Sequence, residues 1–156
     1  MRELMEQTRK YFRLADDDHG EFSIEIDPRE ARGDSVKLLR EIGFNRMSLG
    51  VQDFDQRVQK AVNRIQTEAE TMEVLQAARD QGFRSISIDL IYGLPHQTVQ
   101  GFMATLERII EVAPDRLSVF NYAHLPSRFM PQRRIADEDL PPPRSSSTSC
   151  RPPPSA

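Results

Sequence analysis

The stretch FNRMSLGVQDFDQRVQKAVNR, residues 44–64, decides the fold, because within it a strand pattern changes into a helix pattern. From Asn45 onward apolar side chains alternate with small or polar ones, which is typical of a β-strand with one buried face. After Asp53 the apolar positions recur at helical spacing, so this aspartate is a natural helix N-cap. Gln52 therefore lies where a strand ends and a helix begins. In parallel α/β proteins, ligands bind at the carboxyl ends of strands.

The same order of strand and helix recurs along the chain. Strands are predicted at 21–26, 85–90 and 116–122, besides the central one. Amphipathic helices are predicted at 1–14, from Pro28 to residue 42, at 67–81 and at 98–112. Units of about 30 residues in which strand and helix alternate are typical of right-handed parallel βαβ arrays.

Three of the predicted strands carry small polar residues on one face, followed by a carboxylate or an amide: Ser23 with Glu25, Ser48 and Gly50 with Gln52, and Ser85 and Ser87 with Asp89. A doubly wound sheet is covered by helices on both faces and is apolar on both. The pattern therefore favours a (β/α) barrel with a polar interior and outer helices. Because about four strands cannot close such a barrel, we expect a partial barrel over residues 1–130, truncated at both ends or completed from elsewhere.

Composition narrows the class of protein. Hydrophobic residues make up 38% of the chain and the net charge is −3, so no basic footprint for nucleic acid is present. No apolar run approaches the roughly 20 residues of a membrane helix, and the charged amino terminus is not a secretory signal. We expect a cytoplasmic monomer. Residues 131–156 are rich in proline and serine, which predicts a disordered tail. A neighbouring reading frame can encode an ordinary helix there, so a frameshift is one hypothesis for its origin.

No catalytic or metal-ligating residue is predicted from spacing. The single cysteine, Cys150, excludes an internal disulfide framework and any cysteine-held cluster built by this chain alone. His19, His96 and His124 are scattered without metal-ligand spacing. No nucleophilic triad, phosphate loop or paired-carboxylate spacing is found.

Glu25, Gln52 and Asp89 are the candidate binding residues, since they share the interior phase near the carboxyl ends of three strands. A carboxylate that accepts two hydrogen bonds suits a ribose diol. The structural alternative is that each caps a helix or pairs with a neighbouring arginine. Arg64 offers a fork for a carboxylate, or is a solvated surface arginine. From the residues alone, the prediction is a ligand-binding partial barrel.

Five segments resemble the oxygen-independent coproporphyrinogen III oxidases, which are radical S-adenosylmethionine (SAM) enzymes of haem biosynthesis. They are SIEIDPRE (23–30), GFNRMSLGVQDFD (43–55), VNRIQ (62–66), IDLIYGLPHQT (88–98) and DRLSVFNYAHLP (115–126). The likeness extends from Met1 to about Leu140. A related haem-chaperone branch shares DLIYGLP but typically differs at VQDF with VNR and at FNYAHLP.

The resemblance implies a radical SAM barrel with a [4Fe-4S] cluster, two SAM molecules, coproporphyrinogen III as substrate and an electron donor. In this family a 5′-deoxyadenosyl radical takes a hydrogen atom from a propionate side chain. Loss of carbon dioxide and one electron then leaves a vinyl group. The reaction occurs at two propionates and gives protoporphyrinogen IX. By motif position, Glu25 is expected to contact the SAM at the cluster. The second SAM is expected to contact Gln52, Arg64, Asp89 and Ala123.

The resemblance also implies parts that this sequence does not contain. The family's CxxxCxxC loop is expected before Met1, and a substrate-covering domain after Leu140. We therefore expect this polypeptide to be inactive alone. The alternative function is that of a haem-chaperone relative, which would bind haem through an axial ligand such as His96 or His124 and would lack oxidase activity.

Overall fold

A four-stranded parallel sheet forms the centre of the protein, in a computed structural model that describes residues 1–15 and 18–142. The strands are β1 (Ser23–Ile26), β2 (Arg46–Gln52), β3 (Ser85–Tyr92) and β4 (Arg116–Asn121), and they lie in chain order. The helices are α1 (Arg2–Tyr11), α2 (Gly33–Glu41), α3 (Gln56–Ala61), α4 (Glu68–Asp80) and α5 (Val99–Val112), followed by two 3-10 turns, η1 (Met130–Arg134) and η2 (Asp137–Asp139).

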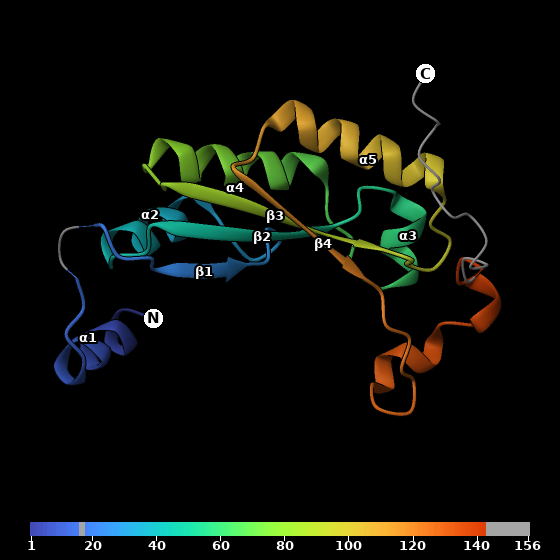
Figure 1. The fold of residues 1–156 in the computed structure, drawn as a ribbon, viewed down its shortest axis with the longest axis horizontal. Coiled ribbons are helices and arrows are strands. Elements are labelled where there is room, and N and C mark those ends of the chain that lie inside the picture. Colours follow the sequence, from blue (N-terminus) through green and yellow to red (C-terminus); the bar gives the residue numbers. More distant parts are fainter. Residues whose placement is uncertain (16–17, 143–156) are drawn as a thin grey trace, which may run out of the picture.

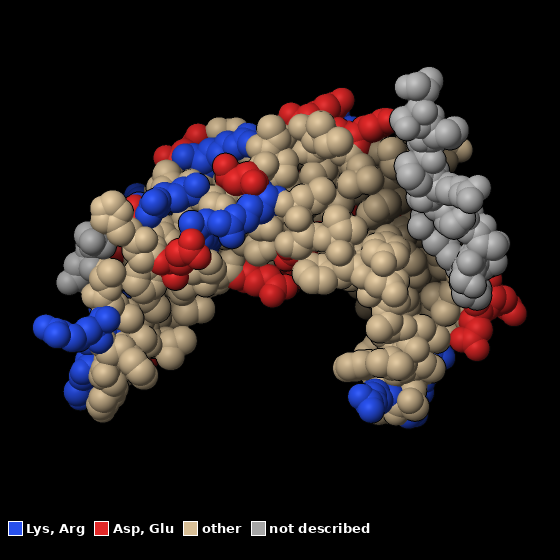
Figure 2. Space-filling view, in the orientation of Figure 1, with Lys and Arg blue, Asp and Glu red and all other residues tan. Residues whose placement is uncertain are grey.

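Helices α2, α4 and α5 cover one face of the sheet, and the molecule has the shape of an arch (Figures 1 and 2). Helix α1 and the η1 segment extend from opposite ends of the arch, and a wide hollow lies between them (Figure 2). The predicted partial barrel with outer helices is thus confirmed as an open, curved sheet of four parallel strands.

The hydrophobic core lies between the sheet and the helices. The alternating apolar side chains of β2 and β3 point into it, namely Met47, Leu49, Val51, Ile86, Ile88 and Leu90, and they pack in one cluster with Val36, Val74, Leu75, Ala78 and Ile109. Each fully buried aliphatic side chain of this kind stabilises the fold by about 1.5–3 kcal/mol. The polar phase of the strands is consequently left on the opposite, open face.

Two predicted helix starts are wrong. Pro28 is not in a helix: it lies in a turn closed by a 3.0 Å hydrogen bond from the Glu30 amide to the Asp27 carbonyl oxygen, and α2 begins only at Gly33. The Asp27 side chain also accepts from the Arg29 amide, at 3.1 Å, so local side-chain bonding competes with helix formation there. By contrast, the capping box predicted at Thr67 is present at the start of α4.

Asp53 is not the N-cap of the helix that follows β2. Asp55 takes that role, because its side chain accepts from the amides of Arg57 and Val58. Gln52 adopts φ = +68° next to an irregularity in the β2–β3 register, which adds residues between strand and helix. Asp53 is instead buried, with 1% of its surface exposed.

The ordered chain continues past residue 130, where composition places the end of the barrel. The turns η1 and η2 follow β4 (Figure 1). Turn η2 lies beside the β3–α5 loop, because the His96 amide donates to the Asp139 carbonyl oxygen. The rest of the predicted tail, residues 143–156, lies outside the described residues. Among the described residues, no helix combines the length and the apolar character needed to cross a membrane.

Candidate cofactor site

The open face of the sheet carries a connected row of polar side chains. Glu25 of β1 is aligned with Ser48 of β2, which is aligned with Ser87 of β3. The Ser48 hydroxyl donates to Asp89 Oδ2 over 2.7 Å, which places Ser48 and Asp89 on one face. Glu25 is exposed on this face and has no hydrogen bond or ion pair with a described residue. The face therefore presents carboxylates to the hollow of the arch.

The three sequence-predicted residues lie on this face at stepped levels rather than at equivalent ones. Asp89 is aligned with Gly50, two residues beyond Ser48, and Gln52 is aligned with Leu90 across the irregularity. At a rise of about 3.3 Å per residue, Asp89 is displaced from Glu25 by about 7 Å along the strands. Such a stagger is expected in a sheet that curves toward a barrel. The two carboxylates thus serve separate positions on the face.

Gln52 and Arg64 converge over Gly50. A Cβ atom added at Gly50 would lie 3.0 Å from Gln52 Nε2 and 3.1 Å from Arg64 Nη2. The absence of a side chain at Gly50 is therefore what allows both groups to lie against the strand. Gln52 Oε1 and Arg64 Nε are buried and have no hydrogen-bond partner among the described residues.

The fork of Arg64 is already occupied by the protein itself. Its Nη2 donates to the Gly50 carbonyl oxygen at 2.7 Å, and its Nη1 lies 3.0 Å from Asp27 Oδ2. Asp27 also binds Arg29, at 2.6 Å. The hydrogen bond from Arg29, and then the charge of Arg64, lower the pKa of Asp27 below its usual value. Arg64 is thus a half-buried, paired residue, and the solvated-surface alternative is excluded.

A cavity of about 400 Å³ opens beside Gln52 and Arg64. Tyr122 lines it, and its hydroxyl is a third buried polar atom without a partner in residues 1–15 and 18–142. Burial raises the pKa of Tyr122. Because buried polar groups are nearly always hydrogen-bonded in native proteins, three such atoms around one cavity indicate a polar ligand.

The other sequence-predicted residues do not line this cavity. Glu25 and Asp89 lie on the open face, and Ala123 is an exposed residue directly after Tyr122. The Ala123 carbonyl oxygen accepts from Gln132 Nε2 at 3.0 Å, so it is bound by a neighbour. Of the five sequence-predicted residues, the structure therefore places Gln52 and Arg64 in the lining of one cavity and the other three outside that lining.

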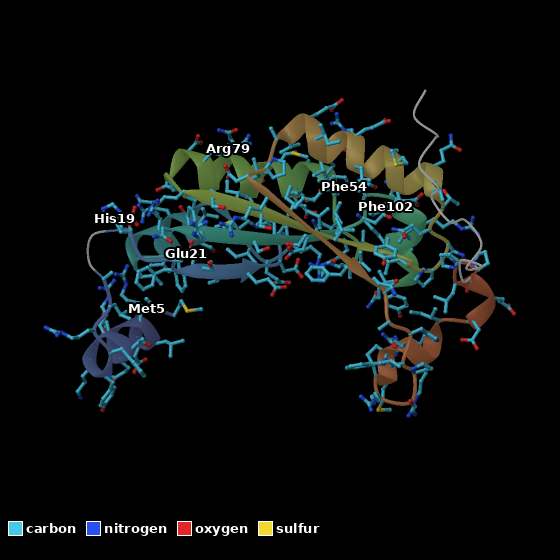
Figure 3. The ribbon with its side chains drawn as sticks, viewed as in Figure 1. Met5, His19, Glu21, Phe54, Arg79 and Phe102 are labelled. Atoms are coloured by element: carbon cyan, nitrogen blue, oxygen red, sulfur yellow. The ribbon has the colours of Figure 1, made fainter. Side chains whose placement is uncertain are left out.

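Asp53 and Gln97 connect the end of β2, next to the site, to the β3–α5 loop, and the sequence did not predict this role for either residue. Asp53 Oδ1 accepts from Thr105 Oγ1 at 2.7 Å, and its Oδ2 accepts from Gln97 Nε2 at 2.5 Å. Gln97 Oε1 accepts from the Gly93 amide at 2.6 Å. This network joins the end of β2 to the β3–α5 loop and to α5, whose Phe102 lies near Phe54 in Figure 3. The position of Asp53 directly after a strand could have indicated this role, but the same position is also typical of a helix N-cap.

The residues do not supply a metal centre. Within 1–15 and 18–142, no group of three His, Cys, Asp or Glu side chains is placed to hold a metal ion. Cys150 lies outside the described residues. His96 Nδ1 lies 3.4 Å from Asp139 Oδ1, and His124 Nε2 lies 3.3 Å from Asp137 Oδ1. Nothing in the described residues favours the haem-chaperone alternative.

Comparison with known families identifies the fold. Residues 2–109 match the model of the radical SAM superfamily. The chain belongs to the radical SAM superfamily. Members of this superfamily use SAM and a [4Fe-4S] cluster, as the resemblance of the sequence implied.

The relatives of this radical SAM chain include enzymes named oxygen-independent coproporphyrinogen III oxidase. The protein from Pseudomonas aeruginosa is 62% identical over 143 residues, and the one from Escherichia coli K12 is 54% identical over 141 residues. These matches cover 92% and 90% of this chain but 31% and 30% of the relatives. The chain thus spans about a third of the length of the curated relatives that it matches.

Solved structures agree with the radical SAM assignment. The coproporphyrinogen III oxidase of Escherichia coli superposes with a TM-score of 0.86 at 53% identity, over 91% of this chain and 32% of that one. The radical SAM methyltransferase TsrM from Kitasatospora setae gives a TM-score of 0.64 at 12% identity, over 80% and 25% of the two chains, which shows a shared fold alone. The partial barrel predicted from strand phase is therefore of the radical SAM type.

Proposed function

We propose that the chain is the SAM-binding barrel segment of an oxygen-independent coproporphyrinogen III oxidase. The identity of 62% with a relative of that name, over 92% of this chain, carries the proposal. The substrate is coproporphyrinogen III, and the partners are this small molecule and an electron donor. The protein acts as a cytoplasmic monomer and binds neither nucleic acid nor membrane.

The proposed reaction is the oxidative decarboxylation of two propionate side chains to vinyl groups, which gives protoporphyrinogen IX. Each propionate loses one hydrogen atom, one carbon dioxide molecule and one electron. When bound, SAM and the cluster supply the 5′-deoxyadenosyl radical that removes the hydrogen atom. The residues of this chain bind and orient the SAM molecules on the polar face.

The site residues fit SAM and do not fit the cluster. The unpartnered atoms of Gln52, Arg64 and Tyr122 offer an acceptor and donors to a nucleoside or an amino acid group. Asp89 keeps one carboxylate oxygen without a described partner, since only Oδ2 is bound by Ser48. A three-cysteine cluster site would require cysteines from outside these 156 residues, so we assign no cluster ligand here.

We assign two SAM positions to the stepped face. Glu25, at the lower step and unpaired, contacts the SAM bound at the cluster. The second SAM lies toward the carboxyl ends of β2 and β3 and contacts Gln52, Arg64, Asp89 and Ala123. Since the Ala123 carbonyl oxygen already accepts a hydrogen bond from Gln132 Nε2, the Ala123 amide is the group left for the ligand.

A chimaera tests the function directly. The matching third of the Escherichia coli relative is replaced by residues 1–142 of this chain, and anaerobic conversion of coproporphyrinogen III is measured. We expect turnover, and we expect Asp89→Ala in the chimaera to abolish it. Asp34→Asn, on the exposed first turn of α2, is the matched control. A chimaera that folds and carries its cluster but does not turn over would contradict the proposal.

A further inference from the structure

The turn η1 and the residue after it, Ile135, form one wall of the 400 Å³ cavity, and hydrogen bonds fasten this wall. Gln132 accepts from the Leu125 amide at 2.5 Å and donates to the Ala123 carbonyl oxygen at 3.0 Å. The His96 amide donates to the Asp139 carbonyl oxygen at 2.7 Å. The wall is thus held to the chain after β4 at one end and to the β3–α5 loop at the other.

The cavity carries an uncompensated positive charge. Arg64 and Arg134 both line it, and no described Asp or Glu does. Arg64 is paired with Asp27, at 3.0 Å, but Asp27 is shared with Arg29. Arg134 is an exposed residue that lines the cavity, and its side chain has no hydrogen bond or ion pair with any residue in the part of the chain that the structure describes. The cavity therefore has room and charge for one anionic group.

We propose that Arg134 binds a carboxylate of the ligand that occupies this cavity. A guanidinium binds a carboxylate through two parallel hydrogen bonds, and this geometry suits a planar anion better than an ammonium does. The inference rests on the proposed function, whose ligands both carry the group: SAM has an α-carboxylate, and coproporphyrinogen III has propionates. The orphaned Tyr122 hydroxyl and Arg64 Nε lie in the same cavity and offer the ligand further hydrogen bonds.

Equilibrium binding to the full chain tests this role, with ligand pairs that differ in their carboxylates. S-adenosylhomocysteine is compared with 5′-methylthioadenosine, and coproporphyrin III with its tetramethyl ester, by titration calorimetry. The variants are R134Q, R134K and the control R133Q; Arg133 is exposed, and its Nε donates to the Pro126 carbonyl oxygen. Circular dichroism verifies that each variant is folded.

We expect R134Q to weaken one carboxylate ligand by about tenfold or more, because a hydrogen bond to a charged group contributes about 1.5–3 kcal/mol. Its carboxylate-free counterpart should bind unchanged, R134K should lose less, and R133Q should match the native chain. The ligand whose binding is weakened shows whether Arg134 binds the α-carboxylate of SAM or a propionate of the porphyrinogen. Equal affinities of R134Q and the native chain overturn the role of Arg134 and leave the proposed function intact. A native chain that binds none of the four ligands overturns both.

Discussion

Arg64 donates a 2.7 Å hydrogen bond from Nη2 to the carbonyl oxygen of Gly50, and so connects the segment after α3 to the middle of β2. The same guanidinium is held by Asp27, which follows β1. One side chain thus links the ends of two strands on the polar face. The cavity beside Gln52 depends on this link, because Arg64 forms part of its lining.

Gly50→Ala should weaken the binding of S-adenosylhomocysteine several-fold with little change in the fold. The new methyl group would lie 3.0 Å from Gln52 Nε2 and 3.1 Å from Arg64 Nη2, and both side-chain ends would have to move. Titration calorimetry measures the affinity. Gly33→Ala is the control, because a Cβ there meets no atom within 4 Å. Equal losses in both variants would argue against the convergence over Gly50.

Asp27→Asn should lower the thermal stability at neutral pH, by about 1 kcal/mol for this partly exposed ion pair. The hydrogen bond from Arg29, followed by the charge of Arg64, lowers the pKa of Asp27 from its usual 3.8. The folded pKa is below the unfolded one, so the stabilisation is fully present above about pH 4 and is lost as the pH falls through the folded pKa.

Thermal unfolding of the native chain and of Asp27→Asn across this acid range measures the effect. The difference between them should shrink as the pH falls below about 4. Glu73→Gln, which removes an exposed carboxylate without a described partner from the middle of α4, should show no such convergence. A difference that stayed constant with pH would mean that the charge of Asp27 contributes nothing.

Asp53→Asn should destabilise the chain by about 2–3 kcal/mol. The asparagine would turn an amide donor toward Gln97 Nε2, which now donates to Asp53 Oδ2. Urea unfolding measures the loss. Adding Gln97→Glu restores an acceptor opposite the new donor, and should recover part of the stability. Recovery stays incomplete because Gln97 Nε2 also donates to the Ile91 carbonyl oxygen, at 3.0 Å.

Thr67→Ala should destabilise the chain by about 1 kcal/mol, since it removes the side-chain cap of α4. Thr67 Oγ1 accepts from the Glu70 amide, and the Glu70 carboxylate accepts from the Thr67 amide at 2.8 Å. Urea unfolding is again the measurement. Ser35→Ala, on the exposed side of α2, is the control and should change stability by a few tenths of a kcal/mol.

The order of strands and helices and the buried face of the sheet could be predicted from local pattern. The alternation around Met47 and Leu49 repeats in β3, and a period of two is independent of distant contacts. The capping box at Thr67 is likewise local, since its two partners are three residues apart. These features can be predicted without knowing which distant parts of the chain are in contact.

The pairing of the site residues could not be predicted, because it joins positions far apart in the chain. The side chain that holds Arg64 comes from Asp27, and the one that anchors Asp53 comes from Gln97. The sequence placed Asp53 at a helix start, where a cap is the common role for an aspartate. Only the left-handed backbone at Gln52 moves the helix start onward and leaves Asp53 free to turn inward.

The left-handed backbone at Gln52 lowers the stability of the chain, while the Gln52 side chain lines the cavity. A side chain at φ = +68° costs about 1–2 kcal/mol relative to an unstrained backbone, and glycine would not incur this cost. Gln52→Gly would relax the chain and at the same time remove an amide from the cavity. A glutamine at this position therefore lowers stability and at the same time places an amide at the cavity, whereas a glycine would do neither.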